Sequence, residues 1–279
     1  MKRVNLAASL FVAVLFLTAV GNVFAAANTF SASGANPAAI QATVDAYRLA
    51  LGTLNPNVVG SFGSGRREIN WDGVPDAASS PNSFPANFFN SNSPRGVVFS
   101  TPGTGFQVSA TAASGVGVRF DNINATYSIT FQTFSPQRLF TAINSNVTDV
   151  NFFVPGTLTQ AFTTGFGAVF TDVDLANTTS LQFFDLQNNS LGTFFVPAAN
   201  LGLSFLGVQF DAGEKVSRVR ITSGSTSLGS SDNSLADVVV MDDFIYAEPQ
   251  AAPEASSLML TCAGVGLIGL MLRRRTAKA

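Results

Sequence analysis

Short runs in which apolar and polar residues alternate dominate most of the chain. In one run Phe106 and Val108 alternate with polar neighbours, and in another Val219 and Ile221 alternate with arginines. Because successive side chains of a strand point to opposite faces, each run predicts a strand with one buried face. Other runs, such as residues 238–240, are apolar throughout. Such runs are typical of strands that are covered on both faces.

These runs recur about every 8–12 residues, with turn-forming residues between them. About a dozen short strands at this spacing predict an all-β fold, and specifically a two-sheet β-sandwich. We find no repeat of the length of a propeller blade, so a propeller is disfavoured. The predicted strands cover residues 96–101, 105–111, 116–121, 127–134, 138–142, 149–154, 166–173, 180–186, 190–196, 203–210, 216–222 and 237–246.

One short helix is predicted near the start of the folded part. Asn36 can cap it, Pro37 suits its first turn and Gly52 ends it. Apolar residues recur between these signals at helical spacing, at Ile40, Val44, Tyr47 and Leu51. We therefore expect residues 26–65 to form this N-terminal helix and an irregular lead-in. Residues 66–248 are expected to form the sandwich domain.

The first 25 residues predict a secretory signal peptide, and therefore an exported protein. Lys2 and Arg3 precede an apolar run over residues 6–20, which is shorter than the roughly 20 residues that a membrane span needs. Small or medium-sized residues favour cleavage by signal peptidase after Ala25, with Ala27 as the second choice. An uncleaved anchor helix is the alternative.

The C-terminal segment, residues 249–279, has three parts. Pro253, Glu254 and a pair of serines come first, and an apolar run over residues 258–272 follows. The segment then carries a basic cluster of Arg273, Arg274 and Arg275. The basic cluster predicts that this end stays on the cytoplasmic side.

This tripartite tail resembles the PEP-CTERM sorting signal of exported bacterial proteins, although Ala255 stands where that family has a second proline. The resemblance implies that an exosortase-like sorting enzyme recognises and removes the tail. The apolar run, residues 258–272, would thus contact the inner membrane only transiently. The protein would then be released or attached at the cell surface. A plain C-terminal membrane anchor, which is retained, is the alternative.

Short patterns within residues 166–247 carry a second resemblance. They look like the jelly-roll bodies that are common among exported PEP-CTERM proteins. They also resemble carbohydrate-binding jelly rolls whose last strand carries an aspartate near a calcium ion. The resemblance implies a jelly-roll-like sandwich and suggests calcium as a cofactor.

Composition excludes several classes of function. The chain has no His and a single Cys, Cys262, so nucleophilic triads that need an imidazole and cysteine-rich metal clusters are excluded. Residues 26–248 contain nine basic and sixteen acidic residues. This acidic balance favours the binding of cations and gives no basic face for nucleic acid.

Oxygen-bearing side chains in one segment are spaced as in a calcium-binding loop. Glu68, Asn70 and Asp72 alternate, Gly73 follows, and Asp76 comes four residues after Asp72. Calcium takes 6–8 oxygen ligands, and this spacing provides several of them. The segment lacks the carboxylate expected at the twelfth loop position, so an Asx-rich structural turn is the alternative.

Asp242 and Asp243 lie in an otherwise apolar strand. Adjacent strand residues point to opposite faces, so we expect at most one of them to face the core. A buried carboxylate needs a partner, which could be calcium, Arg218, Arg220 or backbone amides. If Glu68 converged with either aspartate, one calcium site would account for both segments.

Aromatic residues separate the remaining functional hypotheses. Phe supplies 26 aromatic residues and has no polar group, so phenylalanine is expected in the core. Trp71 and Tyr246 can stack on sugars. Their exposure beside a groove would favour a calcium-assisted module that binds extracellular polysaccharide. Their burial would favour a non-catalytic protein of the cell envelope or extracellular matrix, which is our first hypothesis. A glycosidase-type hydrolase that uses Glu68 and Asp72 is the third.

Overall fold

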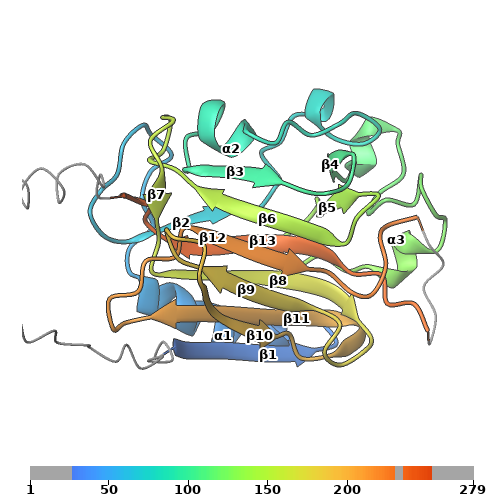
Figure 1. Ribbon diagram of the computed structural model, residues 1–279. Coiled ribbons are helices and arrows are strands. Elements are labelled where there is room, and N and C mark those ends of the chain that lie inside the picture. Colours follow the sequence, from blue (N-terminus) through green and yellow to red (C-terminus); the bar gives the residue numbers. More distant parts are fainter. Residues whose placement is uncertain (1–26, 230–234, 253–279) are drawn as a thin grey trace, which may run out of the picture.

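The computed structural model describes residues 27–229 and 235–252, and its main feature is two antiparallel sheets that pack face to face (Figure 1). The predicted all-β sandwich is confirmed. The predicted signal peptide and sorting segment lie outside the described residues. Within the described part of the chain, no helix is long and apolar enough to cross a membrane.

The larger sheet has the strand order β1-β11-β8-β13-β5-β4, and β2 also pairs with β13. β5 pairs with β13 at Met241, whereas β2 pairs with residues 244–247 of the same strand. The strands of this sheet are β1 (Ala27–Gly34), β2 (Arg66–Ile69), β4 (Gly105–Val108), β5 (Phe140–Ile143), β8 (Gly165–Val173), β11 (Ala199–Phe210) and β13 (Val240–Ala247).

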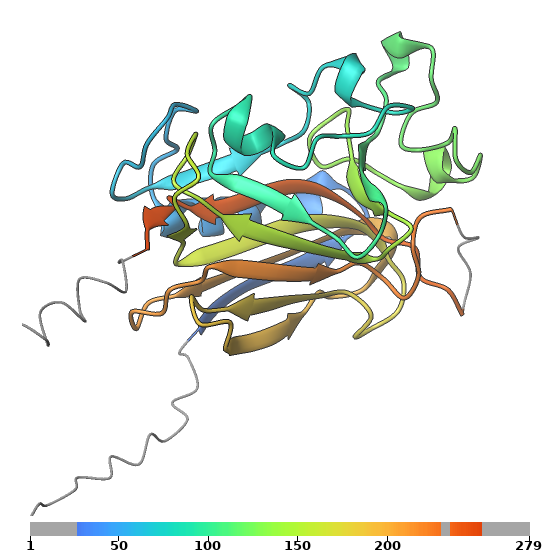
Figure 2. The ribbon, with the colours of Figure 1, turned by 45° about the horizontal axis from the view of Figure 1, so that its top comes forward.

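The smaller sheet has the strand order β10-β9-β12-β6-β3. Its strands are β3 (Val97–Ser100), β6 (Val147–Phe152), β9 (Ser180–Phe184), β10 (Ser190–Phe195) and β12 (Arg218–Thr222). A two-stranded ribbon of β7 (Ala161–Phe162) and β14 (Gln250–Ala251) lies at one end of the sandwich (Figure 2).

The predicted helix is confirmed as α1 (Pro37–Leu51), which packs on the outer face of the larger sheet. Asn36 Oδ1 accepts from the Ala39 N–H at 3.3 Å, and Gly52 ends the helix at a φ of 94°. The ring of Tyr47 lies so close to Gly207 that a Cβ there would approach the ring to 2.8 Å. Glycine in the sheet therefore lets the helix pack closely.

Aromatic rings fill the space between the two sheets. Trp71 lies near the centre, stacked on Phe140 with 4.1 Å between ring centroids and edge-on to Phe244 at 5.1 Å. Phe99 of the smaller sheet contacts Phe140 of the larger sheet at 5.0 Å. These contacts across the sandwich confirm that phenylalanine forms the core.

Two predicted strands, 116–121 and 127–134, are wrong. The first is a turn in which Arg119 and Phe120 have positive φ angles of 50° and 67°. The second contains α3 (Tyr127–Thr130), one of two further short helices with α2 (Phe88–Ser91). Tyr127 and Phe131 recur at helical spacing and share one buried cluster, so their apolar character reflects packing of a helical turn rather than a strand.

The predicted lead-in, residues 26–65, is not separate from the sandwich. β1 pairs with β11 along eight residues and forms an edge of the larger sheet. Its sequence is mostly small and polar, with only Phe30 and Ala32 packing beneath α1. The apolar alternation was therefore too weak to predict this strand.

Candidate functional site

The first half of the predicted calcium segment forms β2. β2 pairs with β13 in a register that sets Glu68 opposite Ile245. Arg48 of α1 reaches the same place, and its Nε and Nη2 donate to the two carboxylate oxygens of Glu68 at 3.1 and 3.0 Å. Arg48 Nη2 also lies 3.3 Å from Asp243 Oδ2. Glu68 and Asp243 thus converge, with a guanidinium between them.

Further charges surround this guanidinium. Arg66 Nε donates to Glu68 Oε1 at 2.6 Å, and Asp45 lies 3.3 Å from Arg48. Burial lowers the pKa of Arg48, but the charges of Glu68 and Asp243 outweigh burial, so the pKa is raised. Arg48 therefore remains a cation that neutralises the carboxylates around it.

A β-bulge sets the positions of Asp242 and Asp243. Met241 lies opposite Phe170 and Phe244 opposite Ala168, so three steps along β13 match two steps along β8. The extra residue breaks the alternation of side chains. Both aspartates consequently reach one side, which corrects the expectation that they point to opposite faces.

The two carboxylates meet at Ser135. Ser135 Oγ lies 2.6 Å from Asp243 Oδ1 and 3.3 Å from Asp242 Oδ1, and the Phe134 N–H donates to Asp242 Oδ2 at 2.6 Å. Burial, and then the charge of Asp243, raises the pKa of Asp242 well above its ordinary value. Burial also raises the pKa of Asp243, although Ser135, Asp242 and Arg48 act against it. The arrangement therefore favours a proton on Asp242.

The other predicted calcium ligands lie apart from Glu68. Asp72 Oδ1 accepts from the N–H groups of Gln137 and Arg138 at 2.6 and 3.2 Å, and Asp76 pairs with the Arg138 side chain at 2.6 Å. Asn70 is exposed. Among residues 27–229 and 235–252, no group of three or more acidic side chains is arranged to hold a metal ion. Residues 71–74 form a turn after β2, and calcium binding stays a prediction.

A cavity of about 480 Å³ opens beside this charged cluster. Glu68, Asn70 and Asp243 line it together with Arg48 and Ser135, whereas Asp72 does not. The acid and base suggested for a glycosidase, Glu68 and Asp72, therefore do not share this cavity.

The two rings expected to stack on sugars are fully buried. Trp71 Nε1 donates to the Asp242 carbonyl at 2.7 Å, and Tyr246 Oη donates to the Arg95 carbonyl at 2.9 Å. Trp71 has a φ of 64°, and its ring lies among core phenylalanines. Neither ring is available as a binding platform, so the prediction that Trp71 and Tyr246 contact a ligand is wrong.

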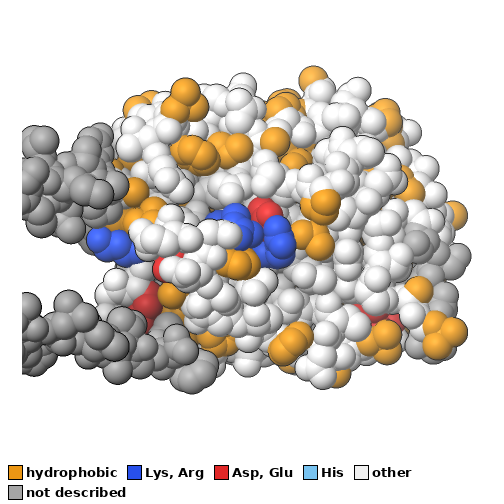
Figure 3. All heavy atoms as spheres, in the orientation of Figure 1, with side chains coloured by type: hydrophobic (Ala, Val, Ile, Leu, Met, Phe, Trp, Pro, Cys, Tyr) orange, Lys and Arg blue, Asp and Glu red, His pale blue; other side chains and the backbone are white. Residues whose placement is uncertain are grey.

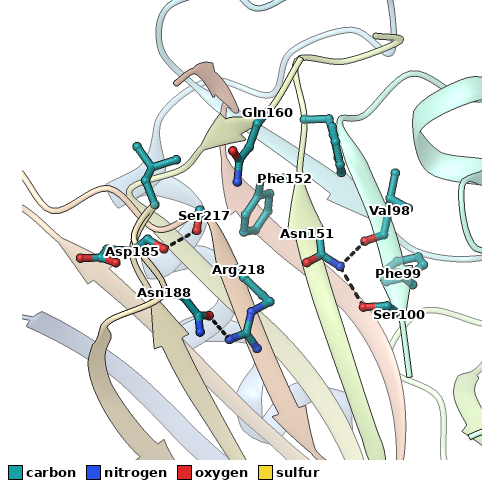
Figure 4. A pocket seen from close by; sticks show the side chains of 12 residues that line it. Val98, Phe99, Ser100, Asn151, Phe152, Gln160, Asp185, Asn188, Ser217 and Arg218 are labelled. Carbon is teal, nitrogen blue, oxygen red and sulfur yellow. Dashed lines mark hydrogen bonds between the residues drawn. The ribbon is translucent and has the colours of Figure 1, made fainter. Parts of the chain in front are cut away.

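The smaller sheet carries a groove of about 430 Å³ that was not predicted from the sequence. Figure 4 shows side chains from several strands and loops converging on it. Arg218 lies over the Phe184 ring at 3.7 Å and donates to Asp149 at 3.0 Å and Asn188 at 2.5 Å. The polar side chains lining the groove are Ser100, Asn151, Gln160, Asp185, Asn188, Ser217 and Arg218.

Figure 3 shows basic side chains gathered in the middle of this face around an acidic group. Arg218 and Arg220 both pair with Asp149, which lies opposite Arg220 in the register of β6 and β12. Alternation had assigned both arginines to a polar strand face. The register of β6 and β12, which brings the residues together, is a long-range property that alternation does not reveal.

Comparison with known proteins adds no relative from which a role could be transferred. No family model, curated protein or solved structure gives a significant match to the chain.

Proposed function

We propose that this protein is an exported, surface-sorted, non-catalytic β-sandwich of the cell envelope or extracellular matrix. The observation that carries this proposal is that the fold uses its candidate reactive groups internally. Glu68 and Asp243 are held by Arg48, and Asp242 is held by Ser135 and a backbone amide. A carboxylate that is buried and fixed in this way stabilises a fold and has little freedom to act on a substrate.

The strand order supports a jelly roll as the finer description of the fold. One sheet contains β5-β13-β8-β11 and the other contains β6-β12-β9-β10. Among these eight strands, each strand and the one that follows it in the sequence lie in different sheets, except for β9 and β10, which are neighbours in one sheet. This alternation is the pattern of a double-sheet jelly roll, and β1, β3 and β4 extend its edges.

The sorting part of the proposal rests on the two ends of the sequence. Signal peptidase would remove residues 1–25, and an exosortase-like enzyme would recognise Pro253 and Glu254 and remove the tail. β1 begins and β14 ends at the same end of the sandwich (Figure 1). Both proposed processing sites are close in sequence to these two strands.

The test compares the chain with a triple variant, Arg273→Ala with Arg274→Ala and Arg275→Ala, in the bacterium that produces it. A Lys278→Ala chain is the control, because it loses a charge outside the arginine cluster. We expect the unchanged and control chains at the surface without their tails, as determined by mass spectrometry, and the triple variant in the membrane fraction. An intact tail on the surface chain would contradict sorting by cleavage.

A second function, polysaccharide binding, is favoured by the groove on the smaller sheet. Its amides, hydroxyls and guanidinium offer both donors and acceptors, and the half-buried Phe153 adds apolar surface. Such a combination suits a polyhydroxylated ligand.

A glycan array tests this second function. We expect Arg218→Ala combined with Asn151→Ala to abolish binding. Gln41→Ala, on α1, should retain it. Equal binding by all three chains would exclude the groove, and addition of EDTA tests the assistance of calcium.

A further inference from the structure

Two loops at the end of the sandwich near β7 and β14 expose apolar side chains. Residues 54–62 contribute Val58, Val59 and Phe62, which are exposed by 48%, 65% and 49%. Residues 153–160 contribute Leu158, which is 92% exposed. We call these four residues the apolar rim. Neither loop contains a charged residue, and clustered apolar exposure of this kind marks a surface that contacts another phase or molecule.

The two loops are held together and to the core. The Gly60 N–H donates to the Pro155 carbonyl at 2.8 Å, and Val59 packs so closely on Gly156 that a Cβ there would meet it at 2.6 Å. The buried guanidinium of Arg67 donates to the carbonyls of Pro56 and Gly60. The rim is therefore a preformed surface rather than a set of loose side chains.

The C-terminal end of the described chain lies within these loops. The Ala252 N–H donates to the Gln160 carbonyl at 2.9 Å, two residues beyond Leu158. Ser61 Oγ donates to the Pro249 carbonyl, and the Phe62 N–H donates to Glu248 at 3.3 Å. Each loop thus contacts the segment that leads out of the fold.

Only five residues, 253–257, separate Ala252 from the apolar run at 258–272. Fully extended, this connection reaches at most about 20 Å. If the apolar run is in a bilayer, as the proposed sorting function requires, the end of the sandwich that carries the rim must lie close to the lipid surface. The charges nearest the rim, Arg67 and Glu248, are buried and paired with each other. The exposed apolar side chains can therefore enter the interfacial region, where they leave water.

We propose that the apolar rim rests on the lipid bilayer while the C-terminal run anchors the chain before sorting. This inference depends on the proposed membrane stage of the protein. It adds that the folded domain itself contacts lipid and has a fixed orientation. α3, at the opposite end of the sandwich (Figure 2), then points away from the membrane.

The test places a fluorescent label at either end of the sandwich, in the chain without its predicted signal peptide, residues 26–279. The single cysteine is removed by Cys262→Ser, and the environment-sensitive dye NBD is attached at Leu158→Cys or, as the matched control, at Ile129→Cys. Ile129 is 81% exposed and lies in α3. The chains are mixed with phosphatidylethanolamine and phosphatidylglycerol vesicles. A companion chain carries Leu267→Arg and Leu270→Arg in the apolar run.

Co-flotation with the vesicles reports anchoring, and the dye reports contact of the rim. We expect the chain to float with the vesicles. The fluorescence emission of the label at 158 should shift to shorter wavelength and be quenched by doxyl lipids. The emission of the label at 129 should remain that of a dye in water. The companion chain should lose both effects. A floating chain whose 158 label resembles the 129 label would overturn the rim contact and leave the proposed anchoring intact. Failure to float would remove both proposals, and a 158 label shielded before vesicles are added would assign the rim to a second copy of the chain.

Discussion

The carboxylates of Asp242 and Asp243 lie on the same side of β13, although the two residues are adjacent in the sequence. The bulge between Met241 and Phe244 brings both to the hydroxyl of Ser135. Two buried carboxylates this close repel each other when both are ionised. Of the two aspartates, only Asp243 lies against Arg48. Burial and the charge of Asp243 raise the pKa of Asp242 well above its ordinary value, so we expect Asp242 to be the one that holds a proton.

We predict that the stability of the Asp242→Asn variant, compared with that of the wild type, increases as the pH rises. A raised pKa in the folded state stabilises the fold below the ordinary aspartate pKa of about 3.9. This contribution is lost as the pH rises from there through the raised pKa of Asp242. Asparagine is neutral at every pH, so the difference in unfolding free energy between variant and wild type should grow in favour of the variant. Urea unfolding between pH 4 and pH 8 measures it.

Two control variants accompany this measurement. Asp211→Asn removes an exposed carboxylate and should show no comparable growth with pH. Asp243→Asn removes the partner of Arg48 and should destabilise the protein at neutral pH. If Asp242→Asn lost stability relative to wild type as the pH increased, the proton would not reside on Asp242.

We predict that Arg48→Met destabilises the protein by about 2 kcal/mol. The substitution leaves Asp243 without its cation and Glu68 with Arg66 alone, and removal of one partner from a buried pair costs about 3–5 kcal/mol. The Arg48 side chain is 21% exposed, so solvent screening reduces that cost. Glu68→Gln in the same chain should recover part of the loss, which thermal or urea unfolding of the single and double variants would reveal.

The same variant tests calcium. In the wild type, Arg48 fills the position between Glu68 and Asp243, so we expect millimolar calcium to leave the melting midpoint unchanged. In Arg48→Met, calcium can replace the missing charge, and binding to the folded state should raise the midpoint. A calcium-dependent rise in the wild type would reveal a site that Arg48 does not block.

The sequence predicted those elements whose signals are local. α1 carries its cap, its apolar stripe and its terminal glycine within seventeen residues, from Asn36 to Gly52, and the structure has the same helix. Alternation likewise predicted the central strands. β1 was missed because its register with β11 depends on residues far along the chain.

The candidate site was only partly predictable for a related reason. Spacing suggested calcium because Glu68, Asn70 and Asp72 alternate. Spacing does not show which basic side chains of other elements reach these carboxylates in the fold. Arg48 reaches Glu68 from α1, and Arg138 reaches Asp76 from the segment before β5. A bulge then reversed the expected orientation of one aspartate. Long-range pairing and backbone irregularity decided the chemistry.

We predict that Trp71 stabilises the fold through both its ring and its N–H group. Trp71→Phe should cost about 1–3 kcal/mol, because the Asp242 carbonyl loses its buried donor. Trp71→Ala should cost about 3–5 kcal/mol, because it also leaves a cavity among the core rings. Phe195→Ala, at an exposed position, is the control and should change stability by about 0.5 kcal/mol or less. Circular dichroism measures all three, and equal stability of the Phe and wild-type chains would contradict a role for the indole N–H.

We predict that the buried ion pair of Arg67 and Glu248 cannot be replaced by a lysine pair. Arg67 donates to both Glu248 oxygens at 2.6 and 2.8 Å and also to the carbonyls of Pro56, Gly60 and Pro94. Arg67→Met leaves a buried carboxylate without its cation and should cost about 3–5 kcal/mol. Arg67→Lys should recover only a small part of this loss, since one ammonium cannot match the planar guanidinium and its carbonyl partners.

Arg67→Met with Glu248→Met should cost less than the two single substitutions together, because neither charge is then left unpaired. Urea unfolding of the four variants measures the coupling, and hydrogen exchange in residues 54–62 should rise first in Arg67→Met. Additive losses would show that the two side chains act independently, and a fully stable Arg67→Lys chain would show that the carbonyl contacts contribute nothing.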